Sequence, residues 1–227
     1  MAQDYGVFSS AHFAILAAIP LTAAALAAWT RRLPRRTAAT RITLAVVLIV
    51  NELVSYVDRT VHGWMRFPDA LPLQLSDLTL WLTIFTLLRP SARLFDIVYY
   101  LGLAGAGLTC VTPELFAPLW ALQSIQFFIA HGGVVIGVLY LVWTRQVRPR
   151  PYSLWKAFGT ALAWAVFAGV FNLVYKTNYM FLCRKPAGAT FIDLFGPWPA
   201  YLFVTAGVAL LLFWLLWLPY RTPRPAS

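Results

Sequence analysis

The chain has 227 residues, of which 60% are hydrophobic and 11% are charged. Soluble domains are about half apolar and a quarter charged, so the composition excludes an ordinary soluble protein. The apolar residues form continuous blocks of about 17 to 22 residues, the length of a membrane-spanning helix, whereas a membrane β-barrel needs shorter alternating segments. The sequence therefore predicts an all-α fold, a polytopic membrane helical bundle of about seven transmembrane helices.

The net charge of +10 does not indicate a nucleic-acid-binding protein, because the basic residues lie in short loops between the apolar blocks. In that position they are typical of topology signals and of contacts with lipid headgroups. We therefore expect membrane lipids as partners, no nucleic acid and no cofactor, in a multi-pass protein of the plasma or inner cell membrane. The sequence does not predict an oligomeric state.

The first predicted span, residues 8–29, is expected to be retained rather than cleaved as a signal peptide. No Lys or Arg precedes it, and it is longer than the apolar region of a typical signal peptide. The other spans of this single transmembrane domain (residues 1–227) follow in chain order at 42–58, 71–88, 94–112, 122–143, 154–175 and 200–218.

Residues 176–199, between the last two spans, are too apolar for a solvated loop and too broken by Pro and Gly for a span. They predict either a re-entrant or interfacial segment packed over the bundle, or an ordered outer loop lying on the membrane. In the second interpretation, Trp198 and Tyr201 are the anchors at the membrane interface.

The orientation follows from the distribution of Lys and Arg, because 13 of the 18 fall in one set of loops. This set comprises Arg31, Arg32, Arg35, Arg36, Arg41, Arg89, Arg93, Arg145, Arg148, Arg150, Lys156, Arg221 and Arg224. The opposite set comprises Arg59, Arg66, Lys176, Arg184 and Lys185. The positive-inside rule then predicts the N-terminus outside and the C-terminus in the cytoplasm.

Several polar side chains lie inside the predicted spans, where they are costly and often functional. At about 1.5 Å of rise per residue, they collect between the midplane of the bilayer and its outer face. The sequence therefore predicts a polar cavity on the outer side, beneath residues 176–199. The residues that define it are Asn51, Glu52, Asp58, Gln74, Ser76, Asp77, His131 and Asn172.

Each of these residues also has a structural interpretation. Glu52 could pair with Arg59, seven residues further along the same helical face. Asn51 and Asn172 are typical of hydrogen bonds between helices. Asp96, at the start of a predicted span, is expected to cap that helix.

His131 alone, among apolar neighbours, could be a core histidine without a chemical role. No paired-histidine spacing accompanies it, so we predict no metal site. Cys110 and Cys183 both fall on the predicted outer side, where a disulfide could form, and the sequence leaves this pairing open.

Three stretches, "LPLQLSDLTLW", "FFIAHGG" and "NYMFLCRKPAGATFIDLFGPWPAY", resemble the YwaF-type integral membrane family of bacteria. That family is distantly similar to eukaryotic multi-span membrane lipid acyltransferases, and the likeness covers roughly residues 50–205. The resemblance implies six to seven helices and, from the relatives, lipid acyl transfer or hydrolysis with an intramembrane nucleophile and a histidine. The family motif reads Pro-Leu-His-Leu-Cys, so Gln74 and Ser76 stand where a histidine and a cysteine are expected, and His131 keeps its place.

The first functional hypothesis is therefore an acyltransferase or hydrolase acting on lipid esters. Ser76 is the predicted nucleophile, His131 the general base, and Asp77 or Glu52 the group that orients the imidazole. Gln74 is expected to donate a hydrogen bond to the developing oxyanion. The other predicted substrate-binding residues are Asn51, Asp58, Asn172, Asn178 and, for a lipid phosphate, Lys176, Arg184 and Lys185.

Two alternatives stay open. In the first, the protein binds or transports a solute or lipid without catalysis, and Glu52 and Asp58 couple to protons or cations. In the second, it is an inactive family member, because Gln74 and Ser76 replace the two most reactive residues of the motif.

Overall fold

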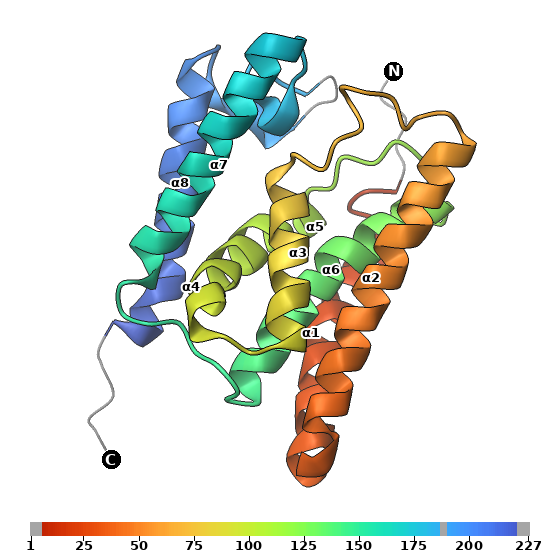
Figure 1. Ribbon diagram of the computed structural model, residues 1–227, viewed down its shortest axis with the longest axis vertical. Coiled ribbons are helices and arrows are strands. Elements are labelled where there is room, and N and C mark those ends of the chain that lie inside the picture. The colour runs from red at the N-terminus through yellow and green to blue at the C-terminus, as the bar shows by residue number, and fades with distance from the viewer. Residues whose placement is uncertain (1–5, 187–189, 222–227) are drawn as a thin grey trace.

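The computed structural model describes residues 6–186 and 190–221, and this part of the chain is helical without a strand. The all-α prediction is therefore confirmed (Figure 1). The α-helices are α1 (Ser10–Arg32), α2 (Thr37–Val61), α3 (Leu75–Leu88), α4 (Ala92–Tyr100), α5 (Gly107–Val111), α6 (Leu122–Trp143), α7 (Ser153–Tyr175) and α8 (Ala200–Trp217). Shorter helices are the π-helix η2 (Leu101–Ala106), which joins α4 to α5, and the 3-10 helices η1 (Pro34–Arg36), η3 (Tyr179–Phe181), η4 (Phe191–Phe195) and η5 (Leu218–Tyr220).

Six elements of the described chain are long and apolar enough to cross a membrane, and α3 is a shorter apolar helix of 14 residues. A helix of that length is about 21 Å long, less than the roughly 30 Å of a bilayer core. It begins at Leu75 rather than at residue 71, because Gln74 is an extended N-cap with φ −68° and ψ 151°. On its own, α3 is therefore too short to cross the bilayer core.

Helix α6 is the centre of the bundle and contacts α1, α2, α3 and η2. Two glycines permit this close packing. A Cβ on Gly133 would lie 2.7 Å from Leu48 of α2, and a Cβ on Gly102 of η2 would lie 2.9 Å from Val138 of α6. Small residues of this kind are typical of helix contacts in membranes. Helices α7 and α8 form a separate layer that joins the bundle mainly through contacts of α7 with α4 (Figure 1).

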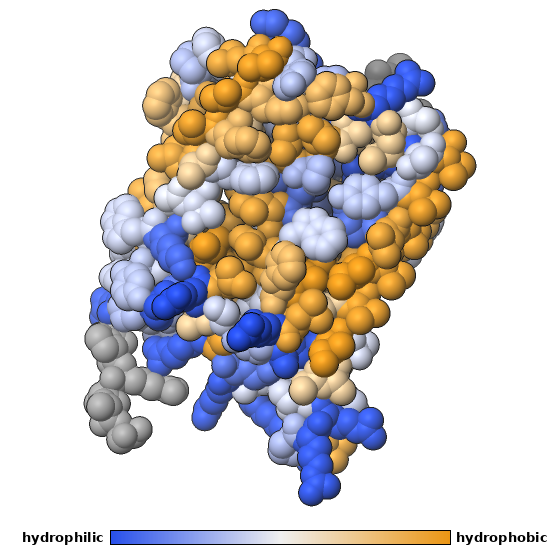
Figure 2. All heavy atoms as spheres, viewed as in Figure 1, coloured by the Kyte–Doolittle hydropathy of each residue, from blue (hydrophilic) through white to orange (hydrophobic). Residues whose placement is uncertain are grey.

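The surface between the two ends of the bundle is apolar. Large side chains such as Leu173 of α7 and Phe203 of α8 are 68% and 75% exposed. Soluble proteins do not expose apolar surface on this scale, so a lipid environment explains it. Figure 2 shows the same belt as hydrophobic colour along α2 and along the C-terminal part of α7.

The cations predicted to share one side gather at one end of the bundle, where α1 ends and α2 begins. At this end the guanidinium of Arg41 donates from Nη1 to the carbonyl of Leu88, the last residue of α3, at 2.9 Å. We call it the arginine-rich end, and Figure 2 shows hydrophilic colour there. Its twelve described cations are Arg31, Arg32, Arg35, Arg36, Arg41, Arg89, Arg93, Arg145, Arg148, Arg150, Lys156 and Arg221. Arg224 lies outside the described residues, and the orientation across the membrane stays a prediction.

Asp96 does not cap a helix, and that prediction is wrong. It is fully buried in the middle of α4, where its carboxylate accepts hydrogen bonds from the backbone and side chain of Arg150 at 3.1 and 2.8 Å. Lys156 lies 3.8 Å from the same carboxylate. Asp96 therefore ties the loop between α6 and α7 to α4.

Replacing Asp96 with alanine should lower the free energy of unfolding by about 2 kcal/mol, because it leaves the guanidinium of Arg150 without its buried partner. Thermal unfolding of the purified protein in detergent measures the loss. Asp69 is exposed, so Asp69→Ala is the matched control and should leave the midpoint nearly unchanged. Equal midpoints for both variants would contradict the structural role of Asp96.

Candidate functional site

Residues 176–186, which follow α7 and which we call the covering segment, lie over the end of the bundle opposite the arginine-rich end, and two amides of the predicted cavity hold them in place. The side chain of Asn172 accepts from the backbone N–H of Tyr179 at 2.8 Å and donates to its carbonyl at 2.9 Å. Gln74 Oε1 accepts from the backbone N–H of Met180 at 2.9 Å. Both side chains therefore hold the backbone of the covering segment against the bundle.

Tyr179 joins the covering segment to the chain that leads into α3. Its hydroxyl donates to the carbonyl of Pro68 at 2.7 Å and accepts from the N–H of Leu71 at 2.9 Å. Burial raises the pKa of Tyr179, so this hydroxyl keeps the proton that it donates. The entry to α3 is thus fixed by residues more than a hundred positions away.

Asn178 also has a structural role, because its side chain closes a turn. Asn178 Oδ1 accepts from the N–H groups of Cys183 and Arg184 at 3.1 Å each, and Nδ2 donates to the carbonyl of Arg184 at 2.9 Å. Of the three cations predicted to hold a phosphate, Lys185 pairs with Asp193 at 3.7 Å. Lys176 and Arg184 are exposed, with no ion pair to any described residue.

The two expected interface anchors behave differently. Trp198 is 60% exposed and donates from Nε1 to the carbonyl of Leu182 at 3.0 Å, as an interfacial tryptophan can. Tyr201 is buried and donates its hydroxyl to the carbonyl of Phe181. The expectation for Tyr201 is wrong, because its ring packs beneath the covering segment instead of facing the membrane interface.

Glu52 of α2 and Asp77 of α3 lie within electrostatic reach of each other. The hydroxyl of Tyr56 faces Glu52 from one helical turn away, and Arg59 lies within electrostatic reach of Asp77. Asp77 also accepts from the N–H of Gln74 at 2.9 Å, which caps α3. Figure 2 shows hydrophilic colour in a hollow between α3 and α2, within the apolar belt.

Asn51 and Asp58, on the same helix, bind α6 instead. Asn51 Nδ2 donates to the carbonyl of Gln126 at 3.2 Å, and Asp58 Oδ2 accepts from Gln123 Nε2 at 3.0 Å. Asp58 also pairs with His62 at 3.4 Å. The buried Nε2 of Gln126 has no hydrogen-bond partner among the described residues. Sequence reasoning missed Tyr56 and Gln126, although Tyr56 lies four residues after Glu52.

Ser76 differs from the threonines of α3 in the hydrogen bonding of its hydroxyl. Thr79, Thr83 and Thr86 each donate to the carbonyl four residues earlier, at 2.7 Å. Ser76 lies in the first turn, so the residue four positions earlier, Pro72, precedes the helix. Within the described chain the half-buried hydroxyl of Ser76 has no hydrogen bond.

Ser76 lies on the face of α3 that turns toward α6. A Cβ on Gly137 of α6 would lie 3.4 Å from Thr83, which is seven residues, or two helical turns, after Ser76. Ser76 also lies at the N-terminus of α3, where the helix dipole favours negative charge. The helix dipole thus favours an oxyanion beside this serine, whereas the carboxylate of Asp77 in the same turn opposes it.

The tautomer of His131 follows from its position in α6. Nδ1 lies 2.9 Å from the carbonyl of Phe127, and a carbonyl can only accept, so Nδ1 carries the proton. Nε2 then keeps a lone pair, and no described residue donates to it. The ring also packs on Phe127, with centroids 4.3 Å apart. The imidazole is therefore held in the form that a general base needs.

Within the described chain, His131 has no hydrogen bond or ion pair with any of its predicted partners, Ser76, Asp77 and Glu52, and its polar contact is the carbonyl of Phe127. Gly133 faces Leu48 of α2, and His131 lies two residues, or about 200°, around α6 from it. His131 thus points away from the helix that carries Glu52. No hydrogen bond links it to Ser76 in the described chain.

Other residues with reactive side chains have structural roles or lie alone. His12 is fully buried, with Nε2 2.9 Å from the carbonyl of Cys110 and Nδ1 accepting from the N–H of Phe8 at 3.0 Å. Cys110 and Cys183 are free cysteines, so the structure has no bond between them. Among the residues described, no group of three or more His, Cys, Asp and Glu could hold a metal ion.

The apolar helices, their exposed belt and the arginine-rich end define a multi-pass helical membrane protein. The sequence model of the TMEM164 family matches residues 7–217, which is nearly the whole bundle. The chain therefore belongs to the TMEM164 family. No curated protein and no solved structure matches it.

Proposed function

We propose that this protein is a membrane-embedded acyltransferase or hydrolase that acts on lipid esters, with Ser76 as the nucleophile. The observation that carries the proposal is the free hydroxyl of Ser76 at the N-terminus of α3, next to threonines whose hydroxyls are all bonded to the helix backbone. The resemblance to YwaF-type proteins and membrane acyltransferases supports the same position. A serine hydroxyl is weakly acidic, so it needs an oriented base.

His131 is the proposed general base. Ser76 Oγ attacks the carbonyl carbon of the ester while its proton passes to His131 Nε2, and the lipid alcohol leaves with that proton. A second alcohol or water then gives its proton to Nε2 and attacks the acyl-serine. The acyl–Oγ bond breaks, and Nε2 returns that proton to Ser76 Oγ, which restores both residues. The carbonyl of Phe127 orients the imidazole, in place of the expected carboxylate. Catalytic hydrogen bonds are often long without substrate, so Ser76 and His131 are expected to approach when a lipid binds.

The remaining polar residues have supporting roles in this proposal. Because Gln74 Oε1 binds Met180, the amide nitrogen of Gln74 points its donors elsewhere and is proposed to bind the oxyanion. Glu52 and Asp77, with Tyr56, form a polar wall for the hydroxyl of an acyl acceptor. Lys176 and Arg184 are the exposed cations proposed to hold a lipid phosphate.

A non-catalytic lipid- or solute-binding protein is the second candidate, favoured by the two carboxylates of Glu52 and Asp77, which lie within electrostatic reach of each other inside the bundle. Lipid binding and lipid-ester turnover, measured together in purified wild type, Ser76→Ala and Glu52→Gln, separate the two candidates. The enzyme proposal predicts that Ser76→Ala binds lipid but has no turnover. Absence of turnover in wild type, with binding lost in Glu52→Gln alone, would favour the second candidate.

A further inference from the structure

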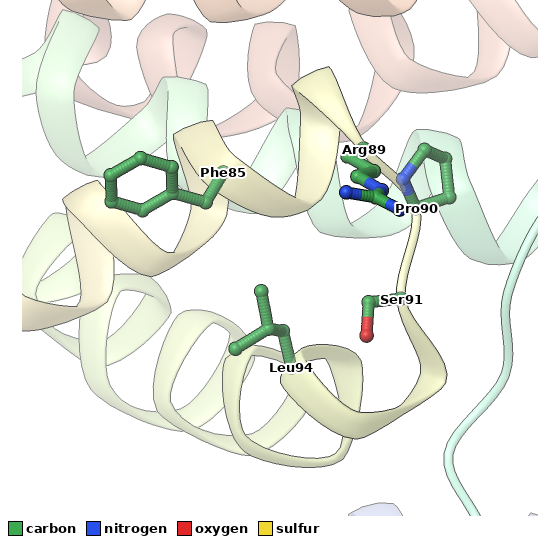
Figure 3. A pocket seen from close by; sticks show the side chains of 5 residues that line it. All are labelled: Phe85, Arg89, Pro90, Ser91 and Leu94. Atoms are coloured by element: carbon green, nitrogen blue, oxygen red, sulfur yellow. The ribbon is translucent and has the colours of Figure 1, made fainter.

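A second candidate site lies at the arginine-rich end, at the turn between α3 and α4. A pocket of about 560 Å³ opens there, lined by Phe85, Arg89, Pro90, Ser91 and Leu94. Figure 3 shows Phe85 of α3 and Leu94 of α4 on opposite sides of the opening, with Arg89 and Ser91 together at the turn. The pocket thus has apolar walls toward the bilayer and a polar end toward water.

The polar end is held in place by the helices around it. The N–H of Arg89 donates to the carbonyl of Phe85 at 2.9 Å, which ends α3. Arg41 of α2 donates to the carbonyl of Leu88, so a second guanidinium is fixed beside the same turn. The carbonyl of Arg93, in the first turn of α4, accepts from Lys156. Two cationic side chains, Arg41 and Lys156, therefore bind the backbone at this turn, which itself carries Arg89 and Arg93.

These positive charges are hardly compensated by the protein. Asp96 is the one carboxylate of the described chain among the twelve cations of this end, and it is bound to Arg150 and Lys156. The other described carboxylates, from Glu52 to Asp193, belong to the opposite half of the bundle or to its loops. Arg89 has no ion pair with any described residue. The site therefore complements an anion.

We propose that this pocket binds an anionic phospholipid. The phosphate accepts hydrogen bonds from the Arg89 guanidinium and the Ser91 hydroxyl, and the acyl chain lies between Phe85 and Leu94. Phe85 is 55% exposed and Leu88 is 41% exposed beside it, so a hydrocarbon chain would cover apolar surface that a soluble anion would leave bare. Basic pockets between transmembrane helices bind anionic headgroups in this way.

This site is separate from the proposed active site. Ser76 and Arg89 lie at opposite ends of α3, 13 residues apart, which is about 20 Å along the helix. The proposal therefore does not depend on catalysis. A variant of Arg89 that loses the lipid is expected to keep its turnover of lipid esters.

Native mass spectrometry of the full chain, titrated with phosphatidylglycerol or with phosphatidylcholine of the same acyl chains, tests the proposal. Wild type should retain phosphatidylglycerol in preference to phosphatidylcholine. Arg89→Gln should weaken phosphatidylglycerol binding about fivefold, the effect of one cation near a membrane headgroup. Arg35→Gln removes the same charge at the same end, outside the pocket, and should change binding less than twofold.

Phe85→Ala provides a second test, because it removes an apolar wall without changing charge. It should also weaken phosphatidylglycerol binding, while the unfolding midpoints of both pocket variants stay near that of wild type. Equal weakening by Arg89→Gln and Arg35→Gln would overturn the proposal in favour of a general surface field. Unchanged binding in both Arg89→Gln and Phe85→Ala would overturn it as well.

Discussion

Replacing Ser76 with alanine is expected to lower turnover of a lipid ester by about a thousandfold or more, the scale of nucleophile loss in a serine hydrolase. The variant should fold normally, because the half-buried Ser76 hydroxyl makes no hydrogen bond in the described chain and its removal leaves no donor unsatisfied. The rate of acyl release by purified protein in lipid nanodiscs measures the effect.

Thr205→Val is the matched control for Ser76→Ala. Thr205 lies on α8, far from α3 in the chain, and its hydroxyl bonds the carbonyl of Tyr201 as an ordinary helical threonine. Its loss should leave turnover within about twofold of wild type. Ser76→Cys should retain activity, because a thiolate is an effective nucleophile and the related motif carries cysteine here. Turnover that persists in Ser76→Ala would remove Ser76 from the mechanism.

Replacing His131 with alanine is expected to lower turnover about a hundredfold to ten-thousandfold, the usual contribution of a general base. Its Nδ1–H is fixed by the carbonyl of Phe127, so Nε2 is the nitrogen that we propose takes the proton of Ser76. His131→Gln should not restore activity, because the amide has no basic nitrogen. Steady-state rates at saturating lipid measure this loss.

His12 supplies the contrasting variant for His131. His12 is fully buried, and both of its ring nitrogens are hydrogen-bonded, one of them to Cys110. His12→Ala should therefore lower the unfolding midpoint, while His131→Ala should lower the rate with a much smaller effect on the midpoint. If His131→Ala destabilises the fold and leaves the rate per folded molecule unchanged, His131 is a core histidine and the proposed base is wrong.

The apolar pattern predicts the spans well where length and composition alone define a helix. The predicted 122–143 coincides with α6, most of whose residues are apolar. The start of α3 is different, because it depends on the capping of Gln74 and on the contact of Gln74 with Met180, which is 106 residues away. Local sequence carries no signal for that distant contact.

For the polar residues, the sequence predicts the helical face on which each one lies, but not the residues that it contacts. The 100° rotation per residue puts Glu52 on an inward face, and the structure adds its approach to Asp77 and Tyr56. It also explains why Asn172 and Asn178 serve as anchors, since both amides bind the backbone of the covering segment. Such backbone partners depend on tertiary structure, which residue type and spacing do not determine.

The absence of a hydrogen bond from the Ser76 hydroxyl to its own helix could in part be predicted from the sequence. A serine two residues after a helix cap has no carbonyl of its own helix to bind, but only the structure fixes the cap at Gln74. The tautomer of His131 likewise needs the position of the Phe127 carbonyl. The assignment of Ser76 as nucleophile and His131 as base therefore depends on where α3 begins and on the contact that His131 makes within α6.

Trapping the acyl-enzyme tests the central proposal most directly. Purified wild-type protein is mixed with a phospholipid that carries an isotope-labelled acyl chain, quenched in acid within the first turnover and digested for peptide mass spectrometry. An enzyme of the proposed kind carries the labelled acyl group as an ester on Ser76, and His131→Ala accumulates far less of it. Release of labelled fatty acid with no acyl group on Ser76 would contradict the proposal.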